Sequence, residues 1–240
     1  MGLFHVDASA QTLKRWQLYV RAGGGASWVN GTRESVVASF GNYATALISK
    51  DGSEAGLLTG SVGVGIAIPV KSQFTIRAEA NLEQKGFRRS VESATTYCTG
   101  GNCGVVYQPP TSTPAVGQIS TRLTYLTVPV IASYRMGKVI LSGGPQINYK
   151  LAERQRGDYQ LLIDHAYTSI NEFSEKTTEF KLIDAGLMAE VGYLIGSRLC
   201  LDLRYSQSLI GSNQQSTSGY VAEATYNRTA QLALRYNLLR

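Results

Sequence analysis

Alternation of apolar and polar residues, repeated eight times along 240 residues, limits how this chain can fold more than any other feature. In one segment Phe74, Ile76 and Leu82 share one row, and Arg77 and Glu79 share the other. A period of two places successive side chains on opposite faces of a β-strand, and no helical period of 3.6 competes with it. We therefore predict eight strands. They cover residues 16–22, 61–70, 74–83, 126–134, 139–149, 183–193, 199–205 and 232–238.

The links between these segments alternate in length. Short links lie near Lys71-Ser72, Gly137-Lys138 and Gly196-Ser197, whereas residues 30–55, 88–120, 152–179 and 211–222 form long links. In an up-and-down barrel this alternation places all long links at one end, as in outer-membrane barrels. We predict an all-β fold over residues 13–240, an eight-stranded antiparallel up-and-down transmembrane β-barrel with four long loops at one end and short turns at the other.

Alternation alone does not say which row faces inward, but two observations favour a membrane barrel. The predicted strands are close to the ~9–11 residues of a tilted membrane crossing, whereas soluble strands average about five or six. The polar rows also mix charges of both signs. Because an eight-stranded lumen is just wide enough for side chains, and buried charges must be paired, we expect an ionic plug. Its expected members are Arg77, Glu79, Glu83, Arg135, Asp184, Glu190, Asp202, Arg204 and Arg235.

Aromatic residues recur near the predicted strand ends, which is the place of an interfacial girdle. They are Trp16, Trp28, Phe74, Tyr125, Tyr134, Tyr149, Phe180, Tyr193, Tyr205 and Tyr236.

Composition excludes several other classes of protein. No unbroken apolar run reaches ~18 residues, so no transmembrane helix is predicted. Charged residues make up 17% of the chain, which is too few for an intrinsically disordered protein. The net charge of +6 is spread along the whole chain, so we expect no nucleic-acid partner.

The amino terminus and the cysteines suggest export. Ala8-Ser9-Ala10 has the form of a signal-peptidase site, so residues 1–12 are predicted to be a residual signal peptide or a disordered N-terminus. Cys98 and Cys103 are predicted to form a loop disulfide in an oxidising compartment, because a zinc site would need further ligands that do not lie nearby.

Five motifs resemble, in order, the outer-membrane β-barrel domain called the porin family in Bacteroidetes. They are Glu83-Gln84-Lys85-Gly86, Tyr125-Leu126-Thr127-Val128-Pro129-Val130, Gly143-Gly144-Pro145-Gln146-Ile147-Asn148-Tyr149, Asp184-Ala185-Gly186-Leu187 and Leu201-Asp202-Leu203-Arg204-Tyr205. The resemblance spans the chain from about Trp16 to its end. It implies the fold and an integral outer-membrane location, and little about activity.

No catalytic constellation is apparent. His5 and His165 are the two histidines, and no G-x-S-x-G motif is present. We expect no enzyme, cofactor or metal, but a monomeric barrel in membrane lipid whose lumen is plugged and whose long loops present a binding surface to a protein or glycan. Two alternatives stay open. One is a soluble lipocalin-like barrel that binds a hydrophobic ligand between inward apolar rows. The other is a narrow channel for small solutes.

Overall fold

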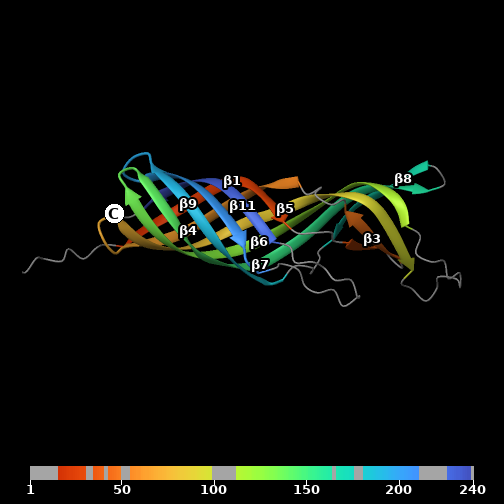
Figure 1. Ribbon diagram of the computed structural model, residues 1–240, viewed down its shortest axis with the longest axis horizontal. Coiled ribbons are helices and arrows are strands. Elements are labelled where there is room, and N and C mark those ends of the chain that lie inside the picture. The colour runs from red at the N-terminus through yellow and green to blue at the C-terminus, as the bar shows by residue number, and fades with distance from the viewer. Residues whose placement is uncertain are drawn as a thin grey trace, which may run out of the picture.

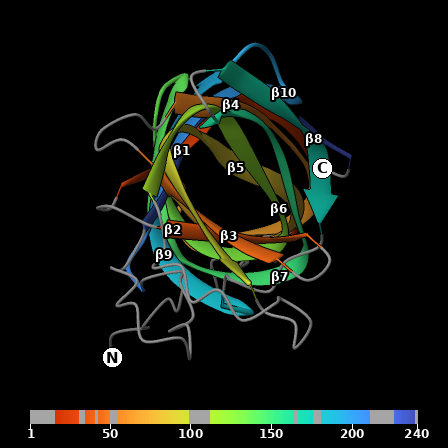
Figure 2. The ribbon, with the colours of Figure 1, turned by 90° about the vertical axis from the view of Figure 1, so that its right-hand side faces the viewer.

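Eight antiparallel strands close into a ring (Figure 2). The computed structural model describes residues 16–30, 35–40, 43–49, 55–98, 112–163, 166–175, 181–210 and 226–238. The ring strands are β1 (Gln17–Asn30), β4 (Ala55–Pro69), β5 (Phe74–Cys98), β6 (Ser112–Met136), β7 (Val139–Ile163), β9 (Ile183–Leu194), β10 (Leu199–Ser208) and β11 (Tyr226–Asn237). They pair in the order β1-β4-β5-β6-β7-β9-β10-β11, and β11 pairs with β1. The predicted barrel is confirmed.

Three further strands extend the sheet on the side of the long links. Strands β2 (Ser35–Phe40) and β3 (Tyr43–Ser49) form a hairpin that adds to the far part of β5, and β8 (Ala166–Glu175) adds to the far part of β7. Figure 1 shows β5, β6 and β7 running past the ring toward β3 and β8. Much of the predicted long links is therefore strand. Outside the bilayer a sheet needs no continuous apolar row, so the alternating pattern of the sequence did not predict these strands.

All the short connections lie at the other end of the barrel, as predicted. Residues 70–73 join β4 to β5, and residues 195–198 join β9 to β10. A two-residue turn joins β6 to β7, with Gly137 at a φ of 61°. Glycine suits this position because two-residue hairpin turns require a positive φ that L side chains rarely adopt.

The apolar rows of the strands face outward. Val62 and Leu203 are each 57% exposed, although both lie in the middle of ring strands. Tyr134, Tyr193 and Tyr236 are also exposed on the outer face. The soluble lipocalin-like alternative is therefore wrong, since it needs apolar rows that point into the lumen. Within the described ranges no helix is long and apolar enough to span a membrane.

One of the residues assigned to the aromatic girdle lies inside the ring instead. Tyr125 is fully buried inside the ring. Every second residue of its strand faces the lumen, and Tyr125 lies on the same face as Leu123 and Thr127. Phe180 falls outside the described residues.

A β-bulge in β7 changes which residues face the lumen. Thr124 pairs with Ala152 and Tyr125 pairs with Lys150, so Leu151 is an extra residue on β7. Before the bulge the even-numbered Asn148 points inward, and after it the odd-numbered Glu153 does. One inserted residue therefore reverses the facing of the rest of the strand.

Candidate functional site

The candidate site is the interior of the ring, where polar side chains from every ring strand meet. Of the nine charged residues expected there, eight are buried, each at most 6% exposed. These are Arg77, Glu79, Glu83, Asp184, Glu190, Asp202, Arg204 and Arg235.

Arg135 differs from the expectation. It has the inward parity of β6, but it follows Ser133, the last buried position before the turn. Its side chain is exposed, and its Nε donates a hydrogen bond to the Gly137 carbonyl oxygen at 2.9 Å. The alternation of residues along a strand indicates which face a side chain lies on, but it does not indicate where the lumen ends.

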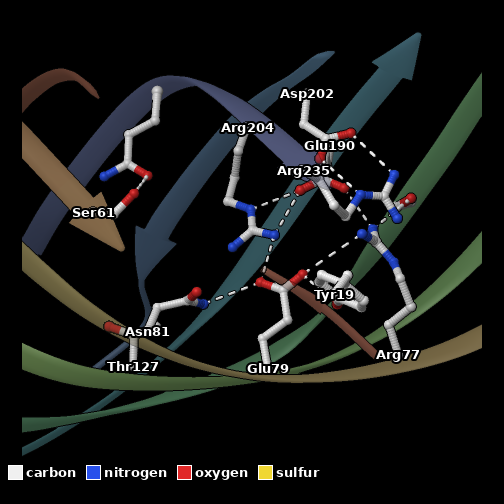
Figure 3. Close-up of polar contacts among 12 residues, drawn as sticks. Tyr19, Ser61, Arg77, Glu79, Asn81, Thr127, Glu190, Asp202, Arg204 and Arg235 are labelled. Atoms are coloured by element: carbon white, nitrogen blue, oxygen red, sulfur yellow. Dashed lines mark hydrogen bonds and ion pairs between the residues drawn. The ribbon is translucent and has the colours of Figure 1, made fainter. Parts of the chain in front are cut away.

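Two arginines and two glutamates form an ion-pair cluster in the middle of the lumen (Figure 3). Arg204 Nη2 lies 2.8 Å from Glu79 Oε2 and 2.6 Å from Glu190 Oε2. Arg77 Nη2 lies 2.5 Å from Glu190 Oε1, and Arg77 Nη1 lies 3.5 Å from Glu79 Oε1. Each cation thus contacts both anions. Because β5 is not adjacent to β9 or β10, the cluster spans the lumen.

Neutral groups add hydrogen bonds to this central cluster, although Arg77 Nη1 has no hydrogen-bond partner in the described part of the chain. The Tyr19 hydroxyl and the Asn81 amide donate to Glu79 at 2.8 and 3.0 Å. Arg77 donates to the hydroxyl oxygens of Ser133 and Ser142 at 2.9 and 3.0 Å. Such partners are what buried ion pairs need, because a charge taken out of water is costly unless its hydrogen bonds are replaced.

A second ion pair lies nearer the turns. Arg235 donates from Nε and Nη2 to the two oxygens of Asp202 at 3.0 and 3.2 Å, which is the bidentate geometry of a strong pair. The thiol of the buried Cys200 donates to Asp202 Oδ1 at 3.2 Å. The Arg235 guanidinium also lies 5.5 Å from the centre of the Tyr19 ring.

On the loop side of the central cluster, the interior side chains form a mixed polar layer and then an apolar one. Glu83 accepts hydrogen bonds from Thr127 at 3.0 Å and from Gln231 at 2.7 Å, and its carboxylate lies 3.1 Å from Lys85 Nζ. Beyond them Val29, Phe87, Leu123 and Tyr125 form a buried apolar cluster, none more than 4% exposed.

Several interior residues were not assigned to the site from the sequence. Arg21 is 3% exposed and lies directly opposite Arg235 in the β1–β11 pair, and its Nε and Nη2 have no hydrogen-bond partner in the described part of the chain. Lys85 is also buried, within a segment noted only as a family motif. Arg21 lies two residues after Tyr19, and Lys85 lies two residues after Glu83, so each shares the lumen-facing side of its strand. This spacing was the signal that could have identified them.

Other sequence expectations fall on residues that the structure does not describe. The proposed leader at residues 1–12, Cys103 and both histidines lie outside the described ranges, and the side chain of Cys98 is likewise not described. The Cys98–Cys103 disulfide stays a prediction. In the described part of the chain, no group of three or more His, Cys, Asp or Glu side chains could hold a metal ion.

The chain matches one protein-family model. The model is described as the outer membrane protein beta-barrel domain, and it matches residues 8–214. No curated protein matches the sequence.

Several solved outer-membrane proteins align over nearly the whole chain. Neisserial surface protein A (NspA) is 10% identical, with 92% of this chain and 97% of that chain covered and a TM-score of 0.38. The outer membrane protease OmpT from Escherichia coli is 9% identical, with coverage of 92% and 97% and a TM-score of 0.42. The attachment invasion locus protein Ail of Yersinia pestis is 10% identical, with coverage of 92% and 98% and a TM-score of 0.39.

Proposed function

Because the chain belongs to the outer membrane protein beta-barrel domain family and is an integral protein of the outer membrane, we propose that it acts as a closed anchor that presents an extended sheet outside the membrane. In this proposal the barrel sits in lipid as a monomer, the lumen carries no solute, and the protein catalyses no reaction. The sheet and the loops beyond it meet a protein or glycan partner. The five sequence motifs are our reason for placing it near the Bacteroidetes barrels.

The observation that carries the proposal is the length of three neighbouring strands. β5, β6 and β7 each contain 25 residues, more than twice the ~11 that a tilted membrane crossing needs. The surplus lies at the end opposite the short turns, which in outer-membrane barrels face the periplasm. A sheet that continues this far beyond the bilayer, widened by β2, β3 and β8, supports a role in contact outside the cell.

Labelling of single cysteines on intact cells tests this arrangement. Gln118 lies exposed on the extension of β6, and Ser72 lies exposed in the turn between β4 and β5. In a background with Cys98, Cys103 and Cys200 changed to serine, Gln118→Cys is expected to react with a membrane-impermeant maleimide on intact cells. Ser72→Cys is expected to react only after lysis. Labelling of Ser72→Cys on intact cells would reverse the orientation and overturn the proposal.

The paired charges and the apolar cluster above them support a closed lumen, so we expect no conduction. The wild-type protein, reconstituted in a planar bilayer, should give no discrete current steps. The variant Arg204→Ala/Glu190→Ala, combined with Phe87→Ala/Leu123→Ala, should conduct, because it removes a contacting cation and anion and also two large side chains of the apolar cluster, and so leaves water-accessible space in both layers.

The matched control for the charged pair of this variant lies on β9 and β10. Val191 and Leu203 are the chain neighbours of Glu190 and Arg204. They pair with each other across β9 and β10 and face outward. Val191→Ala/Leu203→Ala should therefore stay silent. Regular current steps from the wild-type protein would favour the narrow-channel alternative and contradict the proposal of a closed lumen.

A further inference from the structure

The end of the barrel that carries the short turns has only positive charges on its described surface. Residues 70–73, 135–138 and 195–198 contain no aspartate or glutamate. The exposed charged side chains of these three segments are Lys71, Arg135, Lys138 and Arg198. Figure 1 shows the turns together at the end of the barrel that lies away from β3 and β8. We call these four residues the turn-end cations.

Backbone hydrogen bonds join the turns into one rim. The Arg135 amide donates to the Gln73 carbonyl oxygen at 2.8 Å, which ties the β4–β5 turn to the end of β6. Two further amide bonds of 2.9 Å tie the β6–β7 turn to the end of β9 and the β9–β10 turn to the end of β11, at the carbonyl oxygens of Lys138 and Arg198. The turn-end cations therefore follow one another along a hydrogen-bonded rim.

The side-chain partners that the structure gives to the turn-end cations are neutral. Arg135 Nε donates to the Gly137 carbonyl oxygen at 2.9 Å, and Arg198 Nη1 lies 3.5 Å from the Tyr236 hydroxyl oxygen, to which it donates. Residues 1–15 and 239–240, which continue the chain from this end, contain three lysine or arginine residues and one aspartate. Their side chains therefore do not offset the positive charge of the rim.

The same turns also expose apolar side chains. Val70, Met136 and Ile195 lie in or beside the three turns and are 45–53% exposed. They continue the outward rows that carry the exposed Tyr134 and Tyr193, and such aromatic residues mark the interface of a membrane. Each connection has two to four residues, so the turns do not project far from the bilayer. The turn-end cations thus lie at the level of the headgroups, where lysine and arginine place their alkyl stems on apolar surface and their charges in water.

We propose that the turn-end cations bind the phosphate groups of anionic phospholipid in the leaflet that the turns face. That leaflet is the periplasmic one, a detail that rests on the orientation in the proposed function. A guanidinium group donates two parallel hydrogen bonds to phosphate oxygens, and an ammonium group adds a compact charge. Lysine and arginine close to an anionic bilayer surface are attracted to it.

Lipid is the occupant that this surface fits best. An anionic polymer of the periplasm would dock on a polar surface that stands clear of the bilayer. The short turns instead present Val70, Met136 and Ile195 beside their cations. This mixture of apolar and positively charged side chains matches a phospholipid, which offers acyl chains and a phosphate at the same place.

Native mass spectrometry of the full chain in a neutral detergent tests the proposal. Phosphatidylglycerol is titrated against phosphatidylcholine with the same acyl chains. Arg135→Gln/Lys138→Gln is expected to weaken apparent binding of phosphatidylglycerol about tenfold, ~1.4 kcal/mol, and to leave phosphatidylcholine unaffected. Lys71→Gln/Arg198→Gln tests the rest of the rim in the same way. The heat-dependent gel mobility shift verifies that each variant is folded.

Two controls separate charge at the rim from other effects. Arg135→Lys/Lys138→Arg keeps both charges and should bind phosphatidylglycerol nearly as the wild type does. Arg88→Gln/Arg122→Gln removes two exposed arginines on the loop side and should also retain binding. A loss in the charge-conserving variant as large as that in the glutamine variant would mean a structural effect and overturn the proposal. An equal loss in Arg88→Gln/Arg122→Gln would mean diffuse charge attraction and overturn it as well.

Three further outcomes would contradict a phospholipid site. They are equal binding of the two lipids, displacement of phosphatidylglycerol by inorganic phosphate at equal concentration, and its displacement by a soluble muramyl pentapeptide, which would mean a site for the cell wall. Because the measurement is made in detergent, it does not depend on which side of the membrane the turns face. Labelling of Ser72→Cys on intact cells would therefore change the leaflet assigned here but not the binding.

Discussion

The variant Glu190→Gln is expected to unfold with a free energy about 3–5 kcal/mol lower than that of the wild-type barrel. The Glu190 carboxylate contacts both Arg77 and Arg204, and all three side chains are at most 6% exposed. Glutamine keeps the size of the side chain but removes its charge, so one carboxylate, Glu79, remains for two buried guanidinium groups. The measurement is urea-induced unfolding in detergent micelles, followed by the mobilities of the folded and unfolded forms on a semi-native gel.

Glu153→Gln is the matched control for this prediction. Glu153 is also a buried glutamate, but its ion-pair partner Lys150 is 10% exposed and can turn toward water. The loss of stability should therefore be smaller than that of Glu190→Gln. Equal losses in the two variants would contradict the central position that we assign to Glu190.

Gly144→Ala is expected to lower the free energy of unfolding by about 1–3 kcal/mol or more, or to prevent folding altogether. A Cβ atom on Gly144 would lie 1.9 Å from the Val130 carbonyl oxygen of β6. Because that oxygen belongs to the backbone of a neighbouring strand, the clash cannot be relieved by turning a side chain. The same unfolding assay, or the yield of refolded protein, measures the effect.

Gly60→Ala makes the same substitution where there is room. The nearest atom to a Cβ at Gly60 is the Gly23 carbonyl oxygen at 4.0 Å. We expect a change within about 0.5 kcal/mol, as is usual for substitutions at the surface. If the two alanine variants were equally stable, close approach of β6 and β7 at Gly144 would not be a constraint on this barrel.

The ring could be predicted from sequence because each membrane crossing obeys one strong rule. Lipid on one side and a packed polar lumen on the other require strict alternation, and the segment 74–83 already separates Leu82 from Glu83. The same rule grouped Arg77, Glu79, Glu190 and Arg204 on inward rows. It could not say which of them touch, because contacts across the lumen depend on ring order and strand register.

The features that the sequence did not predict lie at positions where this alternation rule does not apply. The extension is largely strand, but outside the bilayer neither face must be apolar. Arg135 has the right parity and lies beyond the end of the lumen. Tyr125 was assigned to the girdle from its residue type, although its parity puts it inside. A single bulge at Leu151 reverses the facing of all that follows on β7, and no composition signal marks it.

The central ion pairs also bear on how the barrel assembles. Glu79 belongs to β5, and its partner Arg204 belongs to β10, which is not its neighbour in the ring. Their contact therefore exists only when the intervening strands are in register and β1 has paired with β11. A partly formed sheet inside the bilayer would hold these charges without partners, which is costly. Such intermediates are disfavoured, so insertion and ring closure should occur together, as one cooperative step.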